Sequence, residues 1–202
     1  MERIWFVGAP GSRWSGVSQF FEALPTVDLG DRRAYRQYTH GSYSGHKGSY
    51  FDPGMEGGND WLNFPQLSNN DIIDEIDRIW GFEQKPNTVR LIKSHILSLY
   101  VDEIKQKFPN DKVVMVMRNN DVCLDWWLEA GGYGITWPSY EFYKPLSKMQ
   151  FWVNMQNNAL RLYADQRDLK WEPFDSEWLG INGVDNATPD MKKYKDVWVL
   201  AV

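Results

Sequence analysis

Short runs of apolar residues recur along this chain, and amphipathic segments separate them. Ile4–Val7 and Val113–Met117 are wholly apolar, and Val89–Ile92 is interrupted only by Arg90. Such runs are typical of strands that are buried on both faces of a parallel sheet. Their alternation with helix-like segments predicts an α/β fold, a three-layer sandwich with a mostly parallel central sheet.

Helical spacing of apolar residues predicts helices at about 17–24, 72–80, 100–108, 121–130 and 147–165. The second follows an expected cap, Ser68, and its inward side chains are Ile72, Ile76, Ile79 and Trp80. The last begins at Ser147, and its expected buried side chains are Phe151, Trp152, Met155, Leu162 and Tyr163. The runs 169–174 and 197–202 are candidates for two further strands.

The stretch from Gly30 to Leu67 is polar, rich in glycine and aromatic residues, and nearly without periodicity. A connection this long is typical of a functional lid or a disordered segment, and its aromatic residues favour a loop that packs over something. We therefore expect one domain, residues 1–202, with a loop insertion at about 30–67. His40 and His46 lie there without a third ligand at a recognisable spacing, so no metal is expected, and Lys47 is a candidate contributor to an anion site.

Composition narrows the function classes. A net charge of −5 argues against broad nucleic-acid binding, although local cations can still hold a small anion. Eleven Trp, ten Tyr and ten Phe can build a core, line a pocket for a flat ligand, or do both. Cys123 is the only cysteine, so a reducing compartment is expected, and no apolar stretch has the length of a membrane span or signal peptide. The expectation is a cytoplasmic protein without membrane or nucleic-acid partners.

Cationic or titratable side chains stand where two apolar runs end. Lys93 and His95 follow one run, and Arg118 follows the other. Ligands of open α/β sheets bind beyond the carboxyl ends of the strands. The pattern predicts that these three side chains project into one crevice and form an anion site.

The first apolar run leads into G-A-P-G-S-R-W-S-G and then into a helix-like segment. Strand, glycine-rich turn and helix N-terminus together can cradle a phosphate group. A strict Walker A motif ends in Gly-Lys-Ser/Thr, whereas this loop has Arg13, Trp14 and Ser15 at those positions. A tight turn without a ligand is the alternative interpretation.

Two segments resemble the P-loop sulfotransferases. F-V-G-A-P-G-S-R-W-S-G is similar to the family's 5′-phosphosulfate loop, and L-I-K-S-H, followed by a helix-like segment and V-V-M-V-M-R-N-N-D-V, is similar to its Lys-Thr-His and Arg-Asn-Pro blocks. The resemblance covers roughly the first 170 residues, with a gap in the loop. It implies a P-loop nucleoside triphosphate hydrolase-like fold. It also implies transfer of a sulfuryl group from 3′-phosphoadenosine 5′-phosphosulfate to a hydroxyl or amine of a small-molecule, glycan or peptide acceptor.

The resemblance also implies roles for individual residues. His95 corresponds to the catalytic base, and Lys93 to the lysine that orients the acceptor or offsets charge on the sulfuryl group. Arg118 corresponds to the arginine that holds the 3′-phosphate. The loop residues correspond to the cradle of the 5′-phosphosulfate: Pro10, Gly11, Ser12, Arg13, Trp14 and Ser15.

The chain departs from the family pattern at two positions. Gly11 stands where the family has its loop lysine. Arg13 can take the role of that lysine only if its side chain turns inward. Asp125 stands where a phosphate-binding serine is expected, and at about 4 Å with an effective dielectric near 20 its repulsion of a phosphate is about 4 kcal/mol. The alternative is therefore a degenerate P-loop protein that binds a nucleotide or anion without sulfuryl transfer. A kinase is a weaker alternative, because the chain lacks the Walker lysine and a clear magnesium-binding pair.

Overall fold

The computed structural model describes residues 3–30, 49–81, 86–181 and 191–202. Its centre is a 7-stranded sheet in the order β2-β4-β1-β5-β7-β6, with β3 also paired to β4. The strand bounds are β1 Arg3–Gly8, β2 Val27–Asp28, β3 Ser49–Tyr50, β4 Val89–Ser94, β5 Lys112–Met117, β6 Glu172–Pro173 and β7 Trp198–Ala201. The three long apolar runs thus lie side by side, which confirms the α/β class.

The sheet is mixed, with most of its strand pairs parallel. β1 pairs in parallel with β4 and β5, and β2 and β3 pair in parallel with β4. β7 pairs with β5 in the antiparallel sense, and β6 is antiparallel to β7. Apolar runs indicate burial but carry no information on strand direction, so the sequence pattern did not distinguish this antiparallel edge.

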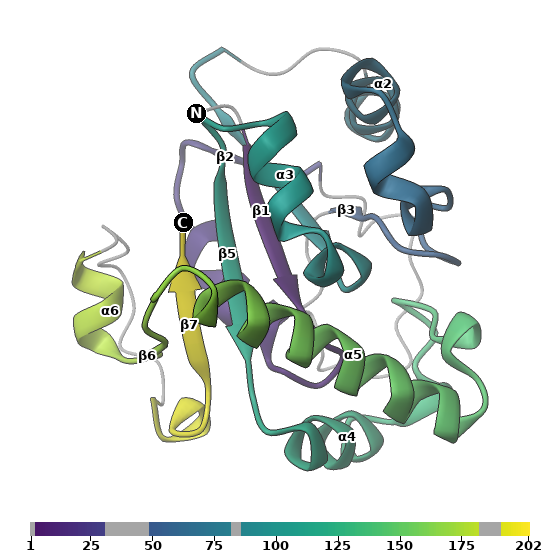
Figure 1. The fold of residues 1–202 in the computed structure, drawn as a ribbon, viewed down its shortest axis with the longest axis vertical. Coiled ribbons are helices and arrows are strands. Elements are labelled where there is room, and N and C mark those ends of the chain that lie inside the picture. Colours follow the sequence, from purple (N-terminus) through teal and green to yellow (C-terminus); the bar gives the residue numbers. More distant parts are fainter. Residues whose placement is uncertain (1–2, 31–48, 82–85, 182–190) are drawn as a thin grey trace.

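Helices cover both faces of the sheet. Trp5 and Val7 of β1 pack with α2 (Asn69–Trp80), α3 (Val101–Lys107) and α5 (Leu146–Asp165). Ile4 and Phe6 point the other way and pack with α1 (Trp14–Glu22) and α6 (Ser176–Ile181). Figure 1 shows α5 crossing in front of the sheet and α4 (Asn120–Glu129) beyond the end of β5.

The helix α2 begins as its sequence predicts. The Ser68 side chain accepts a hydrogen bond from the Asp71 amide, and the Asp71 side chain accepts one from the Ser68 amide. Ile72, Ile76 and Ile79 are buried on its inner face. The capping signal and the apolar spacing are both confirmed because each acts within a turn or two of the helix.

The helix α5 differs from its predicted orientation. It begins at Leu146, with Pro145 rather than Ser147 at the N-cap. Phe151 and Leu162, both expected inside, are 55% and 56% exposed. The buried positions instead include Val153, Gln156, Asn157, Leu160 and Tyr163. Tyr163 is buried as expected, but the apolar pattern did not identify the two amides on the inner face.

The second half of the predicted loop insertion is well packed. Phe51 stacks on Trp61 with ring centroids 4.7 Å apart and on Trp80 at 5.6 Å. Trp61 begins the 3-10 helix η2 (Trp61–Gln66). Residues 31–48, with His40, His46 and Lys47, lie outside the described residues.

Further short 3-10 helices border the sheet: η3 (Ile96–Leu99), η4 (Gly132–Gly134), η5 (Glu141–Tyr143) and η6 (Met191–Tyr194). Within the described part of the chain, no helix combines the length and apolar character needed to cross a membrane.

Candidate functional site

His95 follows β4 directly and lies at the carboxyl edge of the sheet, fully buried. Its Nδ1 lies 2.6 Å from the carbonyl oxygen of Gly8, at the start of the glycine-rich loop. Because a carbonyl only accepts hydrogen bonds, Nδ1 carries the proton and Nε2 presents a lone pair. Nε2 has no hydrogen-bond partner among the described residues. Burial lowers the pKa of His95 to about 4, so the ring is neutral at pH 7 and able to accept a proton.

Asp52 holds the backbone of His95 in place. Its carboxylate accepts hydrogen bonds from the amides of His95 (2.8 Å) and Ile96 (3.0 Å) and from the Ser94 hydroxyl (2.7 Å). Burial raises the pKa of Asp52 to about 7, although these three hydrogen bonds act in the opposite direction. Sequence analysis missed Asp52, whose only signal is the Asp-Pro-Gly turn that begins with it.

Aromatic rings enclose the His95 imidazole. The Trp14 ring lies 4.3 Å from it between centroids, and the Tyr140 and Tyr143 rings lie at 6.1 and 6.3 Å. Trp14 is the first residue of α1, whereas the two tyrosines flank and end η5. These rings exclude water from His95, which is the physical cause of its lowered pKa.

The glycine-rich loop forms a compact turn before α1. The Ser12 amide donates to the Ala9 carbonyl at 3.0 Å, and Arg13 is the N-cap residue of α1 with φ +66°. The buried Ser12 hydroxyl has no hydrogen-bond partner in the described ranges. A helix N-terminus preceded by such a turn presents amide groups and a positive dipole end to an anion.

The position of the family's loop lysine is closed by packing. Gly11 has φ +78°, and a Cβ atom built there would lie 1.8 Å from the carbonyl oxygen of Cys123 in α4. No side chain fits this position unless α4 moves. The close contact with the Cys123 carbonyl therefore restricts this position to glycine.

Arg13 has its guanidinium on aromatic rings. Its Cζ lies 3.7 Å from the centroid of Trp126 in α4 and 5.6 Å from that of Tyr194 in η6. Such stacking holds the guanidinium against the aromatic rings. Arg13 thus places a positive charge at the start of α1.

Lys93 lies in a buried ion pair rather than in an open crevice. Its ammonium pairs with Glu22 of α1, and both side chains are almost wholly inaccessible. The Tyr50 ring lies 5.2 Å from the same ammonium, and Glu22 also accepts from the Ser18 hydroxyl at 2.8 Å. Lys93 pairs in register with Phe6, so it lies on the α1 side of the sheet.

Arg118 links the loop to the C-terminal strand. Its guanidinium donates to the Gly11 carbonyl at 3.3 Å and forms an ion pair with Asp196, which sequence analysis did not single out. Asp125 is exposed on α4, whereas Cys123 is buried. Two residues in a helix are about 200° apart, so the Asp125 carboxylate lies on the face opposite the one that contacts Gly11.

Cys123 itself is not a nucleophile candidate. Burial raises the pKa of its thiol to about 11, so it is protonated at pH 7. Among the residues that the structure describes, no three His, Cys, Asp or Glu side chains are grouped to hold a metal ion.

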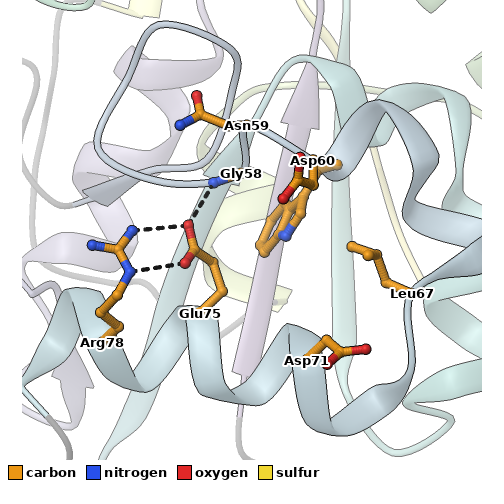
Figure 2. Close-up of a pocket in the computed structure, with 8 residues that line it drawn as sticks. Gly58, Asn59, Asp60, Leu67, Asp71, Glu75 and Arg78 are labelled. Carbon is orange, nitrogen blue, oxygen red and sulfur yellow. Dashed lines mark hydrogen bonds and ion pairs between the residues drawn. The ribbon is translucent and has the colours of Figure 1, made fainter.

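A hollow of about 240 Å³ lies between η2 and α2 (Figure 2). In its lining, Glu75 is bound by Arg78 at 2.9 and 3.0 Å and by the Gly58 amide at 3.0 Å. Asp71 forms the capping box of α2.

Comparisons of the chain with models of protein families, with curated proteins and with solved structures give no significant match. The case for function therefore comes from the residues of the site.

Proposed function

We propose that this protein is a sulfotransferase that moves a sulfuryl group from 3′-phosphoadenosine 5′-phosphosulfate to an acceptor hydroxyl or amine, with His95 as general base. One observation carries the proposal: the neutral His95 ring is fixed by the Gly8 carbonyl of the glycine-rich loop and keeps Nε2 unpartnered within the described chain. A base and an anion-binding turn are thus joined by one hydrogen bond of 2.6 Å.

In the proposed reaction, Nε2 of His95 takes the proton of the acceptor hydroxyl as its oxygen attacks sulfur. The bond between sulfur and the bridging oxygen breaks, and its electron pair leaves on the 5′-phosphate of adenosine 3′,5′-bisphosphate. Charge develops on that phosphate, where the amides that begin α1 and the Ser12 hydroxyl are placed to stabilise it. Arg13, a cation within the loop itself, substitutes for the missing lysine.

Lys93 and Arg118 have roles other than the direct contacts with acceptor, sulfuryl group and 3′-phosphate that the family resemblance implies. Lys93 fixes α1 against β4 through Glu22 and so positions Trp14 over His95. Arg118 reaches a 3′-phosphate only by exchanging Asp196 for it, a swap of one anionic partner for another.

A second candidate function is binding of a nucleotide or anion without transfer. The closed position at Gly11 and the Lys93–Glu22 pair favour it, because both remove a cation from the transferring group. This candidate predicts that adenosine 3′,5′-bisphosphate binds but that no acceptor is sulfated.

Transfer of labelled sulfate to a panel of alcohols and amines tests the proposal, with calorimetric binding of adenosine 3′,5′-bisphosphate alongside. His95→Asn is the informative variant, because its Nδ2 can still donate to the Gly8 carbonyl while the base is removed. We expect transfer to fall about 100-fold or more, with bisphosphate binding retained. Glu129→Gln, at the exposed end of α4, is the control.

The outcomes separate the candidates. Binding of the bisphosphate without transfer by the wild type supports the second candidate. Absence of both binding and transfer at millimolar bisphosphate contradicts both.

A further inference from the structure

Beside His95 lies a set of buried polar atoms that the chain leaves unpaired. The Tyr143 hydroxyl and both polar atoms of the Gln156 amide have no hydrogen-bond partner in the described part of the protein, and both residues are 0% exposed. Burying an unpaired amide is strongly unfavourable, so such groups in a folded protein call for a specific explanation.

These atoms belong to one neighbourhood. The Tyr143 ring stands nearly perpendicular to the His95 ring at 83°, with centroids 6.3 Å apart. Burial raises the pKa of Tyr143 well above its ordinary value, and the adjacent Gln156 amide moderates that rise. The amide is thus next to the hydroxyl, although the two groups do not meet the geometry of a hydrogen bond.

The helix α5 is oriented with two amide side chains on its inner face. The helix turns Gln156 and Asn157 inward while Phe151 and Leu162 are 55% and 56% exposed. The Asn157 amide nitrogen has a structural role, since it donates to the Arg118 carbonyl at 3.1 Å and to Asn120 Oδ1 at 2.7 Å. Gln156 makes no comparable bond in the described chain. A polar residue that breaks the local pattern without a structural partner is typical of a binding site.

The hydrogen-bonding capacity of these atoms indicates which ligand groups could pair with them. The amide offers a donor and an acceptor on adjacent atoms, the phenol does both, and His95 Nε2 only accepts. A hydroxyl beside the reacting hydroxyl satisfies the amide and the phenol together. The Tyr140 ring, with Trp127 at 5.5 Å behind it, supplies an apolar wall for the carbon frame of such a ligand.

We propose that Gln156 and Tyr143 bind the acceptor and select a vicinal diol. One hydroxyl gives its proton to His95 Nε2 and attacks sulfur, and the neighbouring hydroxyl exchanges hydrogen bonds with Gln156 and Tyr143. The proposal rests on the sulfotransferase function proposed above and names the substrate class of that site.

Cyclohexanol and cis-1,2-cyclohexanediol are a matched pair that differs by one hydroxyl, and their kcat/KM values measure the selection. A site built to hydrogen-bond a hydroxyl discriminates against an analogue that lacks it, and we expect the wild type to favour the diol by about tenfold or more. Gln156→Leu should abolish the preference by lowering kcat/KM for the diol toward that for cyclohexanol, because the side chain that hydrogen-bonds the second hydroxyl is removed. Tyr143→Phe should reduce the preference in part.

Gln150→Leu is the matched control, since the same substitution is made at an exposed position of α5. It should leave the diol preference unchanged. A purely structural Gln156 gives a different result: Gln156→Leu raises the melting temperature and leaves the preference as in the wild type, which overturns the proposal.

Binding measurements separate this inference from the proposed function. Calorimetry with each alcohol, on protein saturated with adenosine 3′,5′-bisphosphate, requires no turnover. Transfer with equal kcat/KM for both alcohols overturns the diol inference while the sulfotransferase function stands. Tighter binding of the diol, lost in Gln156→Leu, without any transfer supports the diol site and contradicts the transferase. Equal affinity for both alcohols contradicts the diol site.

Discussion

Lys93 and His95 stand two residues apart at the end of one strand, and both are fully buried bases. Lys93 is charged and paired with Glu22, whereas His95 is neutral with its Nε2 unpartnered in the described chain. A buried charge requires a partner of opposite charge. Once it is paired in this way, the charge is no longer available to bind a ligand. Of these two buried bases, only His95 therefore keeps a lone pair available for a ligand within the described chain.

The largest expected effect comes from removing the Lys93–Glu22 ion pair. Lys93→Met leaves Glu22 as a buried unpaired carboxylate, and we expect the free energy of unfolding in urea to fall by about 3–5 kcal/mol. The double variant with Glu22→Leu should recover much of this loss. Lys170→Met, at an exposed position, is the control. Equal effects of Lys93→Met and Lys170→Met contradict a structural role for the pair.

Asp52 and His95 give stability opposite dependences on pH. The pKa of Asp52 is raised from 3.8 to about 7, so the folded chain keeps a proton that the unfolded chain releases, and this contribution is lost as pH rises through that window. The pKa of His95 is lowered from 6.5 to about 4, so its contribution is present above 6.5 and lost as pH falls toward 4. In the wild type the two nearly cancel between these limits.

Removing either group should reveal the pH dependence of stability that the other contributes. In His95→Asn, we expect the free energy of unfolding to fall by about 3 kcal/mol, relative to its wild-type trend, as pH rises from about 4 to 6.5. In Asp52→Asn the difference from wild type should have the opposite sign. Urea unfolding at half-unit pH steps measures both. Parallel pH profiles for His95→Asn and the wild type would falsify the buried neutral state of His95.

A smaller effect tests the close contact between Gly11 and α4. Gly11 and Gly54 have similar backbone angles, φ +78° and +84°, but a Cβ atom meets the Cys123 carbonyl only at Gly11, and nothing lies within 4 Å of it at Gly54. Gly54→Ala should therefore cost about 1 kcal/mol, from backbone strain alone. Gly11→Ala should cost about 1–3 kcal/mol more, from overpacking. Equal melting temperatures for the two variants contradict the contact between the loop and α4.

The smallest effect concerns Asp125. Because its carboxylate is exposed on the outer face of α4, its repulsion of a bound phosphate is screened by solvent. Asp125→Asn should change the affinity for adenosine 3′,5′-bisphosphate by about twofold or less. A tenfold gain in calorimetry would place the carboxylate at the phosphate after all.

Prediction from sequence succeeded where the signal was local. The strands β1, β4 and β5 and the capping box of α2 follow from neighbouring residues, and they are confirmed. The inner face of α5 was predicted only in part, because it also holds Gln156 and Asn157, polar residues that an apolar pattern does not identify. The antiparallel direction of β7 was not predicted, because an apolar run is the same pattern in either strand direction.

The site shows the same division. Sequence alone determined that a glycine-rich turn, a histidine and an arginine stand at the ends of buried strands. Tertiary structure decided which of them are paired, because the partners come from distant parts of the chain: Glu22 is 71 residues from Lys93, and Asp52 is 43 residues from His95. It also placed the Cys123 carbonyl against Gly11. Local sequence specifies backbone conformation over a few residues, whereas the state of a buried charge depends on every group that packs around it.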